Sequence, residues 1–294
     1  MRYLEREQVE ALQRDGFLLV KNVFSEEEVR KVKELASNYC SINDYRKSPR
    51  GDAMSLDGMA DFLMDDRFIS IAKDILGDEV IYFGDSALHC KPNQRIFHKD
   101  SRSDFSDPSK SDYPIYRMGI FFQDHKDHSG GIKFRVGSHK KVILTPRFVV
   151  NLLKSGGKIL LGQLSFKTLL NFGGIVNARS EIGDVVIWNL RTDHSGGAVL
   201  LKKFPDRALP PSKDEKVPSE EKLPEHPTRM AIFCAYAGPS EATETYTLDR
   251  VNNPAYIDHW KASNFDSPYI VKLAAERGVN LDLRGIKNCR EELG

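Results

Sequence analysis

The sequence predicts a mainly β protein, an antiparallel sandwich or barrel, with helices ahead of the β region. From residue 79 onward, short segments rich in Val, Ile, Phe and Tyr alternate with clusters of Gly, Pro, Asp and Ser, which is typical of antiparallel strands joined by turns. The first 78 residues instead place apolar side chains at helical spacing. With 40% hydrophobic residues and 28 aromatics (16 Phe, 10 Tyr and 2 Trp), the 294-residue chain can fill a core, which excludes global disorder.

Three helical patterns and one short strand precede the β region. A helix is predicted over residues 5–14, and the apolar run 17–20 suits a buried strand. Ser25 and Glu28 form a capping box, because each side chain can accept a hydrogen bond from the backbone amide of the other residue, and this predicts the start of a second helix. Residues 59–76 predict a third helix, which ends before a glycine.

The β region contains two insertions. Residues 141–180 hold apolar pieces with glycine pairs, and we expect them to cover one side of the sheet. Residues 202–228 hold 12 charged residues and six of the 14 prolines, which predicts a solvated loop or lid. The predicted strands are 80–83, 87–91, 115–123, 132–136, 185–190 and 230–237. We expect one domain, residues 1–294, made of a helical flank (1–78), a core (79–240) and a C-terminal extension (241–294).

The chain is almost electrically neutral. Its 43 Lys and Arg against 42 Asp and Glu give a formal charge of +1, which argues against nucleic-acid binding, because such proteins neutralise phosphates with clustered cations. No stretch approaches the roughly 18 apolar residues that span a bilayer, and the charged N-terminus does not resemble a secretory signal. We expect a cytoplasmic monomer or homodimer that acts on a small molecule and binds neither nucleic acid nor a membrane.

The four cysteines are too widely spaced for a zinc site or a dense disulfide framework. Cys40, Cys90, Cys234 and Cys289 are separated by 50, 144 and 55 residues. We therefore expect free thiols at all four positions.

One segment can carry metal chemistry. Side chains at positions i and i+2 of a strand project to the same face, so His98 and Asp100 can bind one ion, although a surface turn gives the same short motif. His194 follows the apolar stretch 185–190 and supplies a third ligand. Two imidazoles and one carboxylate leave three adjacent coordination positions open, as in non-haem Fe(II) oxygenases. Zinc is more often held by three or four nitrogen or sulfur ligands, so iron is favoured.

An arginine would accompany this metal if 2-oxoglutarate is the co-substrate, because a buried carboxylate needs a cation. Arg229 opens the apolar strand 230–237. Two antiparallel neighbours joined by the charged insertion would bring Arg229 to the end of the sheet that carries His194. Arg207 is the alternative, but it lies in the proline-rich insertion.

Several segments together resemble the phytanoyl-CoA dioxygenase family, the Fe(II)/2-oxoglutarate oxygenases that include ectoine hydroxylase. These segments are residues 8–20 with the helix that follows, His98-x-Asp100, residues 130–140, and the Gly-Asp-Val-Val-Ile stretch 183–187. The likeness covers about residues 5–240. It implies a double-stranded β-helix, or cupin-like jelly-roll, with iron between its two sheets and helices on its N-terminal flank.

Residue by residue, His98, Asp100 and His194 match the iron ligands of the family, and Arg229 matches its 2-oxoglutarate arginine. Two departures affect the co-substrate site rather than the metal site. Arg229 follows His194 by 35 residues, whereas about ten separate the two in the family, and Gly196 replaces a serine that contacts the co-substrate.

Other positions follow from the same resemblance. His89 stands where the family contributes a polar contact, often from Asn, to the C1 carboxylate of 2-oxoglutarate, and Lys91 matches a recurrent Lys-Pro that contacts the co-substrate or packs at the strand end. The resemblance places Arg117 and Gly119 on the inward face of one strand, where Arg117 could bind an anionic substrate. The alternative is that Arg117 lies at the surface or in a salt bridge. His139 is expected to be structural, and His125 and His128 are expected in loops.

The function that the resemblance implies is oxidation of a small molecule, as in secondary metabolism, with release of succinate and CO₂. Hydroxylation is the usual outcome, and desaturation, epoxidation or cyclisation are alternatives. Asp100 argues against halogenation, because related halogenases replace this carboxylate with a small residue. A non-catalytic metal-binding or sensor protein on the same fold remains the alternative function, whereas the charge balance argues against a repair demethylase acting on flipped bases.

Overall fold

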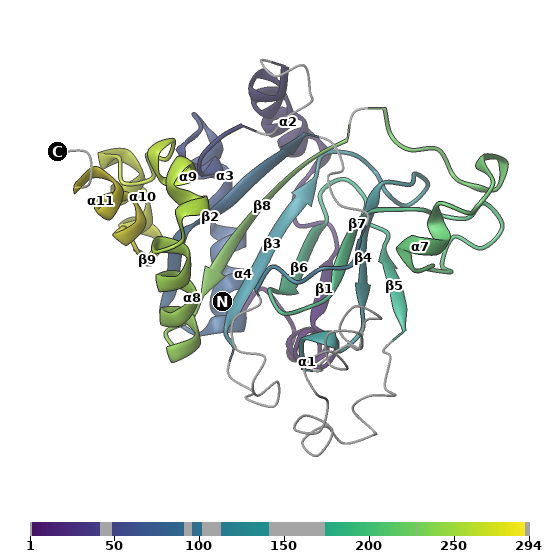
Figure 1. Cartoon of the computed structure of the whole chain (residues 1–294), viewed down its shortest axis with the longest axis horizontal. Helices are drawn as coiled ribbons and strands as arrows, with labels where there is room; N and C mark the ends of the chain where they lie inside the picture. The colour runs from purple at the N-terminus through teal and green to yellow at the C-terminus, as the bar shows by residue number, and fades with distance from the viewer. Residues whose placement is uncertain are drawn as a thin grey trace.

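Two β-sheets form the centre of the structure, with helices around them (Figure 1). The computed structural model describes residues 2–41, 49–90, 96–101, 113–140, 174–227 and 229–291. The larger sheet has the strand order β1-β6-β3-β8-β2-β9, and the smaller sheet has the order β5-β4-β7. Among the described residues these strands pair antiparallel, except that β2 and β9 are parallel. The strands are β1 (Phe17–Val20), β2 (Val80–Cys90), β3 (Ile115–Phe121), β4 (Gly131–Arg135), β5 (Ile175–Ala178), β6 (Val185–Asn189), β7 (His194–Ala198), β8 (Met230–Ala237) and β9 (Val279–Leu281).

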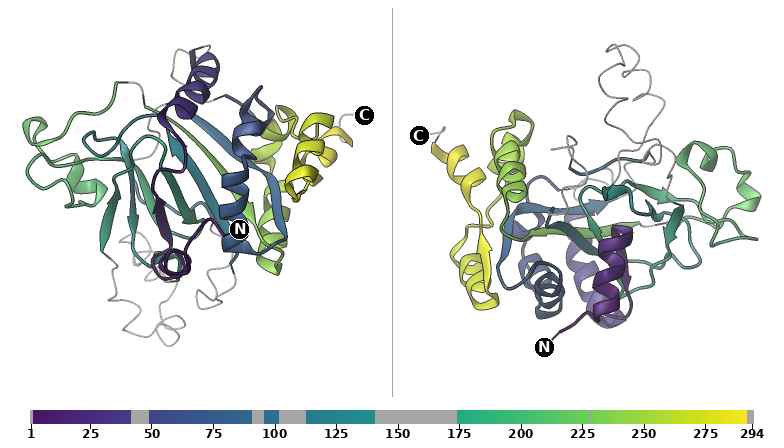
Figure 2. Two further views of the ribbon diagram at one scale, coloured as in Figure 1. Left: turned by 180° about the vertical axis from the view of Figure 1, so that it is seen from behind. Right: turned by 90° about the horizontal axis from the view of Figure 1, so that it is seen from below.

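The helices cover the larger sheet in two groups. Those of the N-terminal part lie on one of its faces, and those of the C-terminal part gather near its β2 and β9 edge (Figure 2). The α-helices are α1 (Arg6–Asp15), α2 (Glu26–Ser41), α3 (Met59–Leu63), α4 (Asp66–Leu76), α7 (Pro211–Asp214), α8 (Glu241–Val251), α9 (Ile257–Lys261), α10 (Pro268–Arg277) and α11 (Arg284–Glu291). Short 3-10 helices are η1 (Ala53–Ser55), η2 (Ser138–Lys140), η3 (Ser219–Glu221) and η4 (Pro254–Tyr256).

The two faces of the larger sheet contribute to two apolar layers. One face packs against the N-terminal helices in the largest core cluster of the molecule. On the other face, Phe121, Trp188 and Phe233 pack against Ile132 and Phe134 of β4 in the smaller sheet. These side chains form an apolar layer between the two sheets.

The predicted start of the chain is confirmed. Helix α1 ends at Gly16, whose φ of 85° lies in the left-handed region that glycine adopts without strain. At the start of α2, the amide of Ser25 donates to Glu28 over 2.8 Å, and the Glu28 amide donates to the Ser25 hydroxyl over 3.3 Å. This is the reciprocal capping box that the sequence predicts, and the predicted short strand β1 precedes it.

Residues 59–76 form two helices rather than one, so the prediction of a single continuous helix was wrong. Helix α3 ends before Asp65, whose backbone is extended. The Asp65 carboxylate accepts the amide of Arg67 over 2.9 Å and so caps the start of α4. An aspartate inside an apolar helical pattern can act as such a cap, because its side chain competes for backbone amides.

Strand β2 is continuous, whereas two separate strands were expected. Its register against β8 shifts between Tyr82 and Ser86, and Gly84 has a φ of 72°. This irregularity lets the Gly-Asp pair lie inside a strand instead of in a turn, and Asp85 is buried there. Strands β5, β7 and β9 were not predicted, since β5 lies in the expected insertion and β7 contains two adjacent glycines.

The insertion 202–228 is anchored to the smaller sheet by a buried ion pair. The ammonium of Lys133 on β4 donates to the Asp214 carboxylate on α7 and, over 2.9 Å, to the carbonyl of Leu209. Both charged side chains are at most 5% exposed. The part of the insertion near α7 is thus a fixed element of the fold. Residues 141–173 of the other expected insertion lie outside the described residues.

Replacing Lys133 with methionine is expected to lower the free energy of unfolding by about 3–5 kcal/mol, because removing one partner of a buried ion pair leaves the other charge poorly compensated. Urea denaturation would measure the loss. The matched control is Lys216→Met, which removes an exposed lysine from the same insertion and should be nearly neutral. A change of less than about 1 kcal/mol for Lys133→Met would contradict an anchoring role.

The expectation of four free thiols is wrong for two of them. Cys40 at the end of α2 and Cys90 at the end of β2 form a disulfide, with their Cα atoms 5.9 Å apart. Cys234 and Cys289 are free and buried. Sequence spacing did not indicate the pair, because 50 residues separate cysteines that only the packing of α2 on the sheet brings together. Among the described residues, no helix is long and apolar enough to cross a bilayer.

Candidate metal centre

Two of the three predicted metal ligands are cross-strand neighbours. His194 is the first residue of β7, and His98 pairs with it in an isolated antiparallel bridge. The His98 amide donates to the His194 carbonyl over 3.0 Å, and the reverse bond measures 2.9 Å. The two imidazole centroids are 4.2 Å apart. His98 and Asp100 do not lie in a regular strand, contrary to expectation. The bridge holds their segment against β7, and the amides of Asp100 and Ser101 also donate to the Leu190 carbonyl, over 3.0 and 3.1 Å.

The backbone orients both imidazoles in the same way. Nδ1 of His98 lies 3.1 Å from the carbonyl of Ile96, and Nδ1 of His194 lies 3.0 Å from the carbonyl of Thr192. Because a carbonyl only accepts hydrogen bonds, each Nδ1 carries the proton, and each Nε2 keeps its lone pair. Burial lowers the pKa of His194, which favours the neutral form that binds metals.

Asp100 completes the cluster with one of its two oxygens. Its Oδ1 lies 3.8 Å from Nε2 of His98 and 3.6 Å from Nε2 of His194. Its Oδ2 accepts a hydrogen bond from the Trp188 indole over 3.1 Å and lies 3.6 Å from Nη1 of Arg117. Oδ1 is therefore left facing the two lone pairs. One donor atom from each of the three residues lies within 4.8 Å of the others, and this set fits a monodentate carboxylate and two imidazoles around one ion.

The charge of Asp100 is maintained by its surroundings. Burial by itself would raise the pKa of this carboxyl group, but Arg117 and the two nearby histidines outweigh it and lower the pKa. The carboxylate is thus ionised at neutral pH and available as a ligand.

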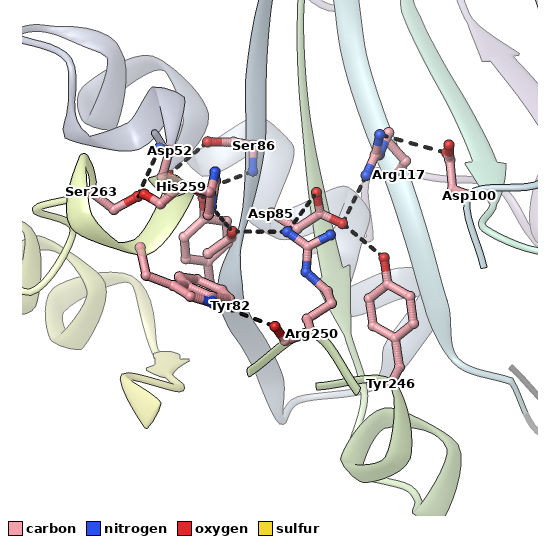
Figure 3. Close-up of polar contacts among 12 residues, drawn as sticks. Asp52, Tyr82, Asp85, Ser86, Asp100, Arg117, Tyr246, Arg250, His259 and Ser263 are labelled. Atoms are coloured by element: carbon pink, nitrogen blue, oxygen red, sulfur yellow. Dashed lines mark hydrogen bonds and ion pairs between the residues drawn. The ribbon is translucent and has the colours of Figure 1, made fainter. Parts of the chain in front are cut away.

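Arg117 on β3 joins the cluster to the C-terminal helices. Its Nη2 donates to Oδ2 of Asp85 over 2.7 Å, which is shorter than its contact with Asp100. Figure 3 shows the Asp85 carboxylate between Arg117 and Arg250, with Tyr246 approaching the same carboxylate oxygen as Arg117. The Tyr246 hydroxyl donates to Asp85 over 3.2 Å, and Arg250 approaches it to 3.5 Å. Burial would raise the pKa of Asp85, but Arg117 and Arg250 lower it overall.

Arg229 lies where β8 begins, as predicted, but not for the predicted reason. Strand β3 separates β6 from β8, and His194 belongs to the other sheet, so the two residues are not on neighbouring antiparallel strands. The Arg229 side chain instead donates from Nε to the Gly130 carbonyl and lies 5.2 Å from the centroid of the Phe121 ring. Burial lowers its pKa to about 10, so the guanidinium stays charged at neutral pH.

Comparisons with known proteins connect this geometry to a chemistry. No family model matches the chain. The crystal structure of EctD from S. alaskensis with 2-oxoglutarate and 5-hydroxyectoine has a TM-score of 0.53 and 17% identity, covering 81% of this chain and 77% of that one. The non-heme alpha ketoglutarate dependent carbocyclase SnoK of nogalamycin biosynthesis has a TM-score of 0.51 and 14% identity, and the match covers 80% of this chain and 85% of SnoK. These two similarities establish a shared fold.

The sequence comparison adds the chemistry. The ectoine dioxygenase of Bordetella bronchiseptica is 26% identical to this chain over 220 residues, which are 66% of this chain and 70% of that protein. The resemblance to the phytanoyl-CoA dioxygenase family is confirmed. The protein is a non-haem iron, 2-oxoglutarate-dependent dioxygenase.

The remaining predicted positions of this dioxygenase differ in their surroundings. His89 on β2 lies 5.8 Å from the Phe233 ring, burial lowers its pKa to about 4, and its imidazole has no hydrogen bond to another described residue. Lys91 lies outside the described residues. His139 is structural, as expected, since it is buried and its Nε2 lies 3.0 Å from the Gln13 carbonyl. Arg207 is exposed.

Several residues of the dioxygenase site were not predicted. Trp188, Asp85, Tyr246 and Arg250 all belong to the contacts around Asp100 and Arg117. Trp188 could have been found, because it lies on a buried strand two residues before a turn that leads to His194. His125, which was expected in a loop, is buried near Arg229. Burial, together with the positive charge of Arg229, lowers the pKa of His125 to about 3.

Proposed function

We propose that the protein hydroxylates a small molecule, using O₂ and 2-oxoglutarate and releasing succinate and CO₂. The convergence of two imidazole Nε2 atoms and one carboxylate oxygen on one point supports this proposal. Desaturation and cyclisation are further outcomes of the same chemistry, and the similarity to the SnoK carbocyclase keeps cyclisation among them. The two sheets would be the halves of a jelly-roll, and the whole chain would act as one oxygenase domain.

His98, Asp100 and His194 would hold the iron, each through one atom. Fe(II) with bound 2-oxoglutarate supplies the oxidation of the substrate by O₂. The contribution of the chain is to fix the three ligands before the metal arrives. The backbone carbonyls of Ile96 and Thr192 set the tautomers of the imidazoles, and Trp188 holds the second oxygen of Asp100. With three protein atoms as ligands, the co-substrate and O₂ would take the other positions around the ion.

Arg229 would bind the C5 carboxylate of 2-oxoglutarate. It is charged, largely buried and placed on the inner face of the larger sheet next to Phe121, so a carboxylate there gains a charge-assisted pair in an apolar setting. His89, neutral in its buried position, would donate to the C1 carboxylate, and Lys91, the next residue of the sequence after β2, would contact the co-substrate. The exposure of Arg207 argues against it as the anchor.

The substrate would be a small molecule of secondary metabolism rather than nucleic acid or lipid membrane, in keeping with the formal charge of +1. We propose a cytoplasmic monomer or homodimer. The Cys40–Cys90 disulfide would then have to persist in a reducing compartment, where such bonds are rare, and thiol counting with and without reductant would test whether the bond forms.

Anaerobic reconstitution tests the proposed reaction. Purified protein mixed with Fe(II) and 2-oxoglutarate should develop a metal-to-ligand charge-transfer band, and admission of O₂ should release succinate. His98→Ala serves as the matched negative control. Retention of iron without a band and without succinate would instead identify a metal-binding or sensor protein.

Asp85 is expected to protect the metal site from Arg117. If Asp85→Asn removes the carboxylate that holds Arg117, the guanidinium keeps only Asp100 as a nearby anion and competes with the metal for it. Metal affinity, measured by calorimetry, should fall about tenfold, the size of one charge-assisted hydrogen bond. Adding Arg117→Gln to Asp85→Asn should restore it. An unchanged affinity in the single variant, or no recovery in the double variant, contradicts this role.

A further inference from the structure

A polar cavity borders the metal cluster on the side of the C-terminal helices. Its volume is about 350 Å³, and its wall includes Asp100. The side chains that carry the argument are Asp85, Arg117, Tyr246, Arg250, Tyr256 and His259. Four of these six come from the segment after residue 240, so the C-terminal extension forms one wall of a cavity that reaches an iron ligand.

The cavity and the 2-oxoglutarate arginine lie toward opposite ends of β3. Arg117 and Phe121 are four residues apart on the same strand and face, which places them about 13 Å from each other. Arg117 contacts Asp100 beside the cavity, whereas Arg229 lies over Phe121. A molecule in the cavity would therefore approach the metal from the side that the co-substrate does not use.

The cavity wall carries one positive charge in excess. Arg117 is paired with Asp85, and the charge of Asp100 is committed to the metal. Within the part of the chain that the structure describes, the Arg250 guanidinium makes two long polar contacts, both from Nη2, at 3.5 Å to Asp85 and 3.5 Å to the Gly84 carbonyl. Its Nε has no hydrogen-bond partner among the described residues, although the side chain is buried with a residue exposure of 7%. The Nε of Arg117 on the same wall also has no partner among these residues, so the two arginines differ in their ion pairs: Arg117 has Asp85 at 2.7 Å, whereas Arg250 has its nearest carboxylate oxygen at 3.5 Å. The guanidinium of Arg250 is therefore the one with charge available for an anion in the cavity.

The orientation of Arg250 is fixed by aromatic stacking. Its guanidinium lies 4.2 Å from the centroid of the Tyr256 ring, and the Trp260 indole donates to its backbone carbonyl over 3.4 Å. A guanidinium held against an aromatic face keeps its edge available for a planar, bidentate partner. A carboxylate has that shape, and its single charge matches the single excess charge of the wall.

We infer that this cavity is the substrate subsite, and that it takes a compact molecule with one carboxylate, which Arg250 binds. The inference rests on the proposed oxygenase function and adds to it the substrate class. It assigns the substrate-binding role to Arg250, from the C-terminal extension, and leaves Arg117 as the salt-bridged arginine of the alternative, held by Asp85 beside Asp100.

The test uses benzoate and benzamide, which have the same shape and differ in charge. Full-length protein is loaded with Ni(II) in place of iron and saturated with 2-oxoglutarate, so that the carboxylate site at Arg229 is filled and no turnover occurs. Calorimetry should give benzoate an affinity at least about tenfold higher than benzamide. Arg250→Gln should remove this preference, Arg250→Lys should keep part of it, and the exposed control Arg207→Gln should leave it intact.

The outcomes separate this inference from the proposed function. If the wild-type protein binds neither Ni(II) nor 2-oxoglutarate, the function itself fails. If it binds both but shows no benzoate binding, or equal affinity for the two probes, the carboxylate subsite is refuted without any variant. A benzoate preference that survives Arg250→Gln, in protein with unchanged metal content and circular dichroism, also overturns the assignment to Arg250.

Discussion

Protein with Asp100 replaced by alanine is expected to lose iron and to release no succinate. The carboxylate supplies the only negative charge among the three ligands, and its Oδ1 lies 3.6–3.8 Å from both imidazole Nε2 atoms. Changing a residue that merely orients a ligand typically costs about 10- to 100-fold in metal affinity, so loss of the ligand itself should exceed about a hundredfold. Metal content after gel filtration and a succinate assay would measure both effects.

Two further variants make this result specific. Trp188→Phe keeps the ligand but removes the indole hydrogen bond to Oδ2, and it should weaken metal binding by the smaller, about 10- to 100-fold amount. Asp127→Ala removes an exposed carboxylate elsewhere and should change neither quantity. Iron retained by Asp100→Ala at the wild-type level would exclude this cluster as the metal site.

Replacing Arg229 with alanine is expected to raise the 2-oxoglutarate concentration needed for half-maximal turnover by about 30-fold or more, while iron binding is unchanged. Truncating one partner of a buried charge pair costs about 2–5 kcal/mol, and 2 kcal/mol corresponds to roughly that factor. The apolar ring of Phe121 beneath the guanidinium limits compensation by water. Titration of 2-oxoglutarate against succinate release gives the value.

Two further variants, Arg229→Lys and Arg207→Ala, test whether Arg229 or Arg207 binds 2-oxoglutarate. Lysine keeps the charge but not the bidentate geometry, so an intermediate requirement is expected. Arg207 is exposed, and its removal should have no effect. If Arg207→Ala raised the requirement and Arg229→Ala did not, the co-substrate anchor would lie in the charged insertion instead.

The metal cluster could be predicted because its signal is local. His98 and Asp100 are two residues apart, and His194 follows a strand whose apolar run stands out in the sequence. The start of α2 was predictable for the same reason, since Ser25 and Glu28 satisfy each other's amides within one turn. Ser25 and Glu28, like His98 and Asp100, are fixed relative to each other by a few residues of chain, and His194 was found from the apolar strand directly before it.

Features that depend on long-range packing could not be predicted. Asp85 appeared to lie in a turn, and only the register shift of β2 against β8 places it inside the sheet next to Arg117. Arg250 is 165 residues further along the chain than Asp85, in a helix with no motif. The Cys40–Cys90 bond likewise follows from how α2 meets the end of β2. Hydrophobic periodicity specifies which face is buried, but it does not specify which buried polar groups meet.

The wall that α8 and the following residues contribute to the polar cavity has a consequence for how this protein could diversify. The three proposed metal ligands come from the middle of the chain, whereas Tyr246, Arg250, Tyr256 and His259 come from its last fifth. Mutations in that last fifth could therefore change which substrate the enzyme accepts without altering the proposed metal site. Exchange of the C-terminal segment between relatives would be a direct route to new substrate selectivity with an unchanged metal site.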